Sequence, residues 1–123
     1  MTLPKLTPEP GSTPDAVIVT AEFVPALGQA RIQYTKSDAP DFAEYEIRMT
    51  PGPTWSNDDD SVIGNIADIN TLEFLTTAGV ETEGLTASYK VYVRTTTGNQ
   101  SGSDPVSVTR PVVVPPPPPP GPP

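Results

Sequence analysis

The chain contains no cysteine and no histidine. Without cysteine there are no disulfide bonds and no thiolate nucleophile, so a folded domain has to be held together by packing alone. The absence of histidine removes the commonest general base, the commonest side-chain metal ligand and every catalytic pair of serine or cysteine with histidine. Any catalysis would therefore have to use carboxylates.

Basic residues are also few. The chain has 7 lysines and arginines against 15 aspartates and glutamates, which gives a formal net charge of −8 at pH 7. Binding of phosphate groups requires a cluster of basic residues, and here they are spread along the chain. We therefore expect neither nucleic acid nor an anionic membrane as a partner.

Long apolar runs are missing as well. No stretch approaches the roughly 20 apolar residues that span a bilayer, and the start of the chain lacks the basic and apolar regions of a signal peptide. We expect no signal peptide in this chain. A protein of extracellular type would then leave the cell by another route, such as release of virus particles at lysis.

Proline is abundant, with 18 residues, and it marks both ends of the chain. The prolines within residues 1–15 and the run at 115–120 predict extended arms, because proline cannot donate a hydrogen bond to a sheet. At about 3.1 Å per residue, residues 115–123 would form a rod of roughly 28 Å. The chain thus divides into an N-terminal arm (1–15), one domain (16–111) and a C-terminal polyproline arm (112–123).

Within the domain, short segments alternate apolar and polar residues, as strands with one buried face do. Residues 62–69 are broken by a glycine and predict only a poor edge strand, and residues 98–102 predict a turn. No segment shows the period of a helix. We therefore predict an all-β fold, a seven-stranded antiparallel β-sandwich. The main strand candidates are residues 16–24, 30–34, 45–49, 71–75, 89–95 and 106–109.

Two of these segments carry a family resemblance. The alternations Tyr45-x-Ile47-x-Met49 and Tyr89-x-Val91-x-Val93 resemble central strands C and F of a fibronectin type III domain. The resemblance implies that Tyr89 is the corner tyrosine, whose ring caps the core while its hydroxyl binds nearby backbone. An immunoglobulin-like relative is the alternative.

The sequence departs from that family at two positions. Tyr34 replaces the usual tryptophan of strand B, and Glu83 replaces the leucine that commonly precedes the corner tyrosine. We expect Leu85 or Val80 to fill the space. The turn at 98–102 has no Arg-Gly-Asp tripeptide, so integrin binding is not implied.

The alternation also assigns side chains to two faces. Tyr34, Tyr45, Ile47, Tyr89, Val91 and Val93 are predicted to form the core. Glu44, Glu46, Lys90 and Arg94 are predicted to share an exposed face with Tyr92, where opposite charges on neighbouring strands can pair. Glu44 and Glu46 would lie roughly 7 Å apart, a spacing that suits a pair of catalytic carboxylates, but a solvated face offers nothing to shift a pKa. We expect no catalytic residue and no cofactor.

Residues 57–60 form the densest group of oxygen ligands, Asn-Asp-Asp-Asp. They do not fit the EF-hand pattern, because Val62 and Ile63 occupy positions that need a side-chain oxygen and a glycine, so we predict a solvated turn and no metal site. The neighbouring Trp55 is a candidate for surface contact with a sugar or a partner. We favour the alternative, in which the Trp55 side chain covers one end of the core.

The C-terminal arm provides the predicted partner contacts. Its valines are apolar and otherwise unexplained, and its prolines have little conformational entropy to lose on binding. The arm also resembles ligands of SH3 and profilin-type grooves, although it lacks the basic residue that usually orients such ligands. The predicted contact residues are Val112, Val113, Val114, Pro115, Pro116, Pro117, Pro118, Pro119 and Pro120.

These observations predict a non-catalytic structural protein of a large extracellular assembly. The leading hypothesis is a component of a tailed-phage virion, such as a capsid decoration or tail protein, whose arms contact identical or neighbouring subunits. One alternative is a spacer or accessory module of a bacterial secreted enzyme or surface protein. Another is an adaptor that presents its polyproline tail to a groove.

Overall fold

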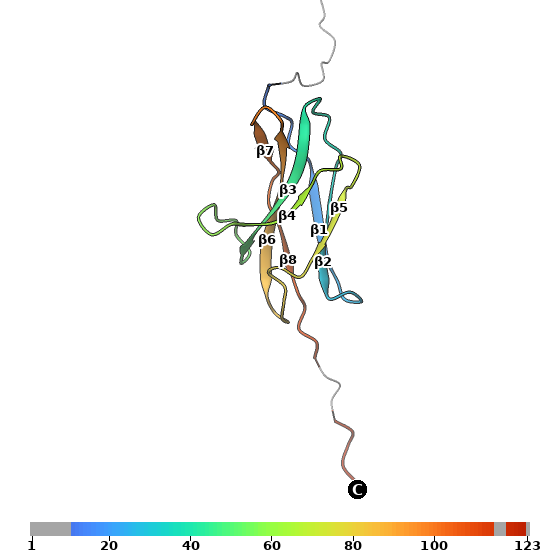
Figure 1. Cartoon of the computed structure of the whole chain (residues 1–123). Helices are drawn as coiled ribbons and strands as arrows, with labels where there is room; N and C mark the ends of the chain where they lie inside the picture. Colours follow the sequence, from blue (N-terminus) through green and yellow to red (C-terminus); the bar gives the residue numbers. More distant parts are fainter. Residues whose placement is uncertain (1–10, 115–117, 123) are drawn as a thin grey trace, which may run out of the picture.

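The computed structural model describes residues 11–114 and 118–122. Two antiparallel sheets lie face to face (Figure 1). One sheet has the strand order β1-β2-β5 and the other β4-β3-β6-β7, with β8 also paired to β6. The all-β sandwich is therefore confirmed, and the described residues include no helix that could cross a membrane. The strands are β1 (Val19–Val24), β2 (Gln29–Tyr34), β3 (Phe42–Pro51), β4 (Ser61–Ile66), β5 (Glu73–Thr76), β6 (Thr86–Thr95), β7 (Gln100–Gly102) and β8 (Val106–Thr109).

The structure has eight strands where the sequence predicted seven, because the last part of the domain forms two strands in succession along β6. Residues 100–102, which were predicted as a turn, form β7. Pro105 interrupts the ladder between β7 and β8, since it has no N–H group. Ser103 compensates: its N–H donates to the Val91 carbonyl at 2.9 Å, and its hydroxyl accepts from the Val91 N–H at 3.0 Å.

Strand β4 is better formed than predicted. It has six residues and pairs with β3, with a bulge between Ile47 and Arg48. Gly64, which breaks the apolar pattern in the sequence, is required by packing, because a Cβ atom there would lie 2.5 Å from the ring of Phe74. The glycine thus lets the Phe74 side chain of the opposite sheet approach β4 closely.

The core lies between the sheets and contains the side chains predicted to face inward. The rings of Tyr34 and Tyr45 pack with their centres 4.7 Å apart, and Phe42 packs on the Tyr45 ring at 4.6 Å. Burial of one such side chain contributes about 1.5–3 kcal/mol, so these residues account for much of the driving force for folding. The confirmed core residues are Tyr34, Tyr45, Ile47, Tyr89, Val91 and Val93, each at most 5% exposed.

The corner-tyrosine prediction is confirmed for Tyr89. Its hydroxyl donates to the carbonyl of Ala78 at 2.6 Å, and the ring is fully buried. Of the two residues proposed to fill the space left by Glu83, Val80 is fully buried, whereas Leu85 is 41% exposed. The chain therefore closes this end of the core with Val80.

The other two core tyrosines hold a second loop in the same way. Tyr34 donates to the carbonyl of Thr71 at 2.8 Å, and Tyr45 donates to the carbonyl of Ile69 at 2.9 Å. The Tyr45 hydroxyl also accepts the N–H of Ser37 at 2.9 Å. These bonds attach the connection between β4 and β5 to the core without a disulfide.

The first prediction concerns the register of β6. Replacement of Val91 by aspartate should abolish the cooperative thermal transition, because it buries an unpaired charge in a fully enclosed position. The matched control is Val62→Asp, since Val62 is 50% exposed on the edge strand. The control should change the free energy of unfolding by no more than about 0.5 kcal/mol. A folded Val91→Asp protein would contradict the placement of the core.

The second prediction concerns the Tyr89 hydroxyl. Replacement by phenylalanine leaves the Ala78 carbonyl without this donor, which should lower the free energy of unfolding at pH 7 by about 1–3 kcal/mol in urea titrations.

A pH dependence follows from the same group. Burial, with a smaller effect from Glu81, raises the pKa of Tyr89 from 10.0 to about 12. A folded-state pKa above the unfolded value means that the stabilisation is complete below pH 10 and is lost as the pH rises toward 12. The melting temperature of the parent should therefore fall more steeply over this range than that of Tyr89→Phe. Parallel curves would show that Tyr89 does not carry the effect.

Candidate interaction surfaces

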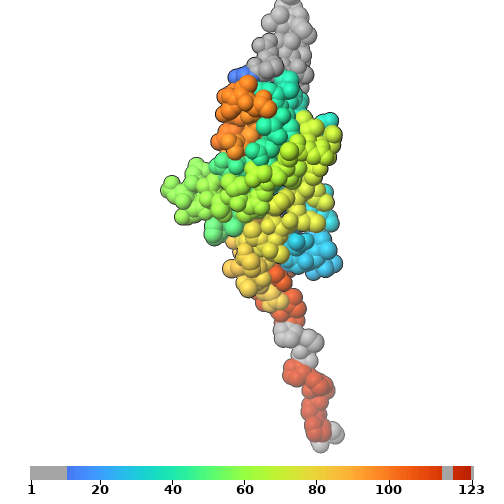
Figure 2. Space-filling view, in the orientation of Figure 1, coloured from blue at the N-terminus to red at the C-terminus, as the bar shows by residue number. Residues whose placement is uncertain are grey.

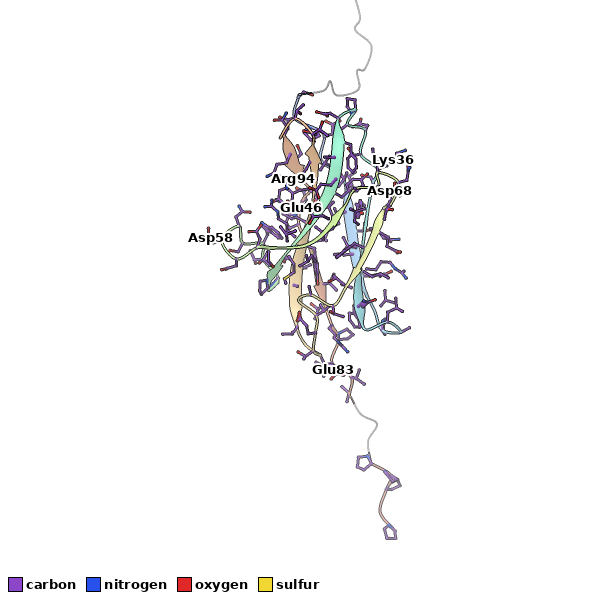
Figure 3. The ribbon with its side chains drawn as sticks, in the orientation of Figure 1. Lys36, Glu46, Asp58, Asp68, Glu83 and Arg94 are labelled. Carbon is purple, nitrogen blue, oxygen red and sulfur yellow. The ribbon has the colours of Figure 1, made fainter. Side chains whose placement is uncertain are left out.

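The outer face of the larger sheet carries a network of charges centred on Glu46. Glu46 was predicted to be exposed, but it is only 4% exposed. Its Oε2 atom accepts from Arg48 at 2.7 and 3.0 Å, and its Oε1 atom accepts from Arg94 at 3.3 Å (Figure 3). Tyr92 lies directly opposite on β6. The prediction was wrong for Glu46 because these long side chains close over it.

The other members of the predicted exposed face are less enclosed. Glu44 and Lys90 are half-buried, and Arg94 is exposed. Arg94 lies 3.8 Å from Glu44 and 3.3 Å from Glu46, which confirms the predicted pairing of charges across strands. Tyr92, which was predicted on the exposed face, is 8% exposed and lies under the Arg48 guanidinium at 4.3 Å.

Both glutamates of the face are thus occupied by structural contacts. Glu46 uses both oxygens for arginines, and Glu44 accepts a hydrogen bond from Asn65 at 2.6 Å. Glu44 and Glu46 therefore do not stand as a free pair of carboxylates on this face.

The loop 52–60 projects sideways from the sandwich (Figures 1 and 2). Asp58 lies at its tip, Asp59 accepts from the Ser56 hydroxyl at 3.2 Å, and Asp60 pairs with Arg48 at 3.3 Å (Figure 3). The described residues contain no group of three or more acidic side chains placed to hold a metal ion. The solvated turn remains the simplest description of this loop.

Trp55 lies in the same loop and is half-buried. It is not part of the core cluster, so the favoured interpretation as a cover over the core is wrong. Its indole N–H donates to Asn57 Oδ1 at 2.6 Å, and the Lys90 ammonium lies 5.4 Å from its ring centre. The loop holds Trp55 against the outer face of the sheet, where sequence alternation alone could not place it. The candidate role in surface contact stays a prediction.

The N-terminal segment is tied to one pole of the sandwich. The N–H of Gly11 donates to Asp41 at 3.0 Å, Asn99 donates to the Gly11 carbonyl at 2.7 Å, and the Ser101 hydroxyl donates to the carbonyl of Pro14. The Asp41 carboxylate also accepts a hydrogen bond from the Thr97 hydroxyl at 2.7 Å. The hydrogen bonds from the Gly11 N–H and the Thr97 hydroxyl lower the pKa of Asp41. Residues 11–14, predicted as arm, are therefore attached to the domain, while residues 1–10 lie outside the described residues.

The C-terminal segment leaves from the opposite pole (Figure 1). Val112, Val113 and Val114 are 63%, 69% and 80% exposed, and Pro118–Pro120 are exposed as well. Pro115–Pro117, also predicted as contacts, lie outside the described residues. At this pole Arg110 donates to the carbonyls of Val80 and Glu81, both at 3.1 Å. The arginine thus ties the start of the C-terminal segment to the domain.

The third prediction tests the Glu46 network. Glu46→Gln removes the charge that Arg48 and Arg94 share, and it should lower the free energy of unfolding by about 1–3 kcal/mol. The lower part of that range applies because the Arg94 side chain is 44% exposed and its charge is screened by solvent. Glu44→Gln is the matched control and should change stability by less than about 0.5 kcal/mol. Equal effects in urea titrations would contradict a central role for Glu46.

No family model and no curated protein matches this sequence. Solved structures do resemble the fold. A fibronectin type III-like protein from Clostridium thermocellum has a TM-score of 0.61 at 18% identity, over 84% of this chain and 99% of that one. A myokine structure has a TM-score of 0.58 at 18% identity, over 81% of this chain and 100% of that one.

Part of an enzyme is similar too. Pectate lyase PelI from Erwinia chrysanthemi matches with a TM-score of 0.58 at 20% identity, over 76% of this chain. This chain spans only 27% of the length of that enzyme. At these identities the likenesses concern the fold alone. The chain has a fibronectin type III-like β-sandwich fold.

Proposed function

We propose that this chain is a non-catalytic structural module that separates and orients the parts joined to its two ends within an extracellular protein or assembly. The observation that carries the proposal is the position of those ends. Residues 11–14 and 112–114 leave the sandwich at opposite poles (Figure 1). A rigid domain placed between two such connections keeps whatever they join at a set distance.

The chemistry of the described surface supports a role without catalysis. The glutamates of the outer face are engaged by arginine and asparagine side chains. A hollow of about 270 Å³ beside the start of β1 is lined largely by apolar residues such as Val17, Ile18 and Val106, with Asp104 as its acidic member. Neither the outer face nor this hollow combines a nucleophile with a base in the way that hydrolysis or group transfer requires.

Two settings fit this role. One is an accessory module of a bacterial secreted enzyme or surface protein, and the similarity to part of a bacterial pectate lyase supports it. The other is a component of a tailed-phage virion, in which the C-terminal arm contacts neighbouring subunits. The exposed valines at 112–114 support the second setting, because assembly would bury them.

The fourth prediction tests these settings by deletion of residues 112–123. None of the described tail residues makes a hydrogen bond or an ion pair, so the melting temperature should change by less than about 4 °C. In the virion setting the full chain forms oligomers or enters particles, and the deletion abolishes this. Sedimentation of both proteins measures the difference. Loss of folding would instead show that the tail packs on its own domain.

A shorter deletion is the control. Removal of residues 118–123 retains residues 112–117, so retained assembly would assign the contact to 112–117 and lost assembly would assign it to 118–123. A full chain that stays monomeric at all concentrations and does not enter particles would contradict the virion setting and leave the accessory module.

A further inference from the structure

One cation on the outer face of the larger sheet, Lys90, forms no ion pair with the residues that the structure describes. Lys90 on β6 lies directly opposite Arg48 on β3, and like charges in this position repel each other. Arg48 is compensated by Glu46 at 2.7 Å and by Asp60 at 3.3 Å. No carboxylate lies within ion-pair distance of Lys90 in the part of the chain that the structure describes. The sheet therefore keeps an uncompensated positive charge at a fixed place.

Two aromatic rings hold this charge in position. The Lys90 ammonium lies 5.0 Å from the centre of the Tyr92 ring and 5.4 Å from the centre of the Trp55 ring. The ring faces attract a cation without neutralising it, so the charge remains available to an anion. Trp55 is itself fixed by the hydrogen bond to Asn57, and Tyr92 is covered by Arg48. A partner would therefore meet groups that lose little freedom on binding.

We propose that Lys90, Trp55 and Arg48 form a docking site for an acidic segment of a partner protein. A carboxylate of the partner pairs with the Lys90 ammonium, which relieves its repulsion by Arg48, and an apolar neighbour of that carboxylate packs on Trp55. Tryptophan, tyrosine and arginine are the residues most enriched at the energetic centres of protein interfaces. This inference rests on the structural role proposed above and adds a class of partner to it. The site lies on a different surface from the tail.

Charge favours a protein segment over a polyanion. The site offers one uncompensated cation. Glu44 lies on the same outer face beside Arg94, Asp58 lies on the adjacent loop (Figure 3), and Asp59 follows it in sequence. A uronate polymer or a nucleic acid carries a negative charge on every unit and would meet these carboxylates as well as the net charge of −8. A protein segment can present a single carboxylate next to apolar side chains.

The experiment uses Trp55 as its reporter, because it is the single tryptophan of the chain. The full chain is titrated with a blocked Leu-Glu-Leu-Glu-Leu peptide, and the fluorescence of Trp55 is recorded. We expect a saturable change that the same peptide with glutamine in place of glutamate does not produce. The response should weaken in 1 M salt, where charges are screened beyond about 3 Å.

Two variants separate docking from structure. Lys90→Gln should weaken binding by about tenfold or more, which is the effect of losing one good charge pair. Its melting temperature should stay close to that of the parent, because the repulsion by Arg48 and the attraction of the two rings are lost together. Lys36→Gln is the matched control, since Lys36 is exposed and lies on the other side of the molecule from loop 52–60, and it should bind like the parent (Figure 3).

Three outcomes would overturn the proposal: no saturable response, equal binding by Lys90→Gln and the parent, or tighter binding of polygalacturonate than of the glutamate peptide. The last outcome would assign the surface to an acidic polysaccharide. None of these outcomes affects the sedimentation experiment on the tail, so failure of this site and failure of the proposed structural role can be told apart.

Discussion

The pairing of β3 with β6 is the interaction on which both the core and the outer surface depend. Ile47 lies opposite Val91 on the buried side, and Glu46 lies opposite Tyr92 on the outer side. Because side chains alternate along a strand, a slip of one residue would exchange these two sides. The hydrophobic effect therefore sets the register, and the register in turn brings the arginines of the outer face to Glu46.

Three core tyrosines fix the loops to this core through hydrogen bonds to loop backbone. A sandwich without cysteine has no disulfide cross-link between its sheets, and the connections after β4 and after β5 have to be held by other means. Tyr34, Tyr45 and Tyr89 combine a buried ring with a hydroxyl that binds loop backbone, so one side chain serves both purposes. The rigid domain that results can hold its two poles apart, which is what the proposed structural role requires.

The outer face shows how the proposed docking surface can arise beside such a core. Glu46 forms ion pairs with Arg48 and Arg94. Arg48 also packs over the Tyr92 ring and lies opposite Lys90. These contacts join neighbours on β3 and across to β6, whose positions the core has already set. In this arrangement the uncompensated charge of Lys90 is repelled by Arg48, and a partner that supplies a carboxylate would offset this repulsion.

Period-two alternation by itself determined the sheet class and the inward set that includes Tyr45 and Val91, because these depend on neighbours in sequence and on burial. The corner role of Tyr89 came from the resemblance to the fibronectin type III family. Only the tertiary structure decided the rest. The β7 strand depends on a Ser103 side chain that replaces a backbone partner, and the burial of Glu46 depends on the long side chains of Arg48 on its own strand and Arg94 on β6. Trp55 could not be placed either, because a loop folds back onto the sheet through contacts distant in sequence. Alternation assigns a residue to a face, but exposure on that face is set by whatever packs over it.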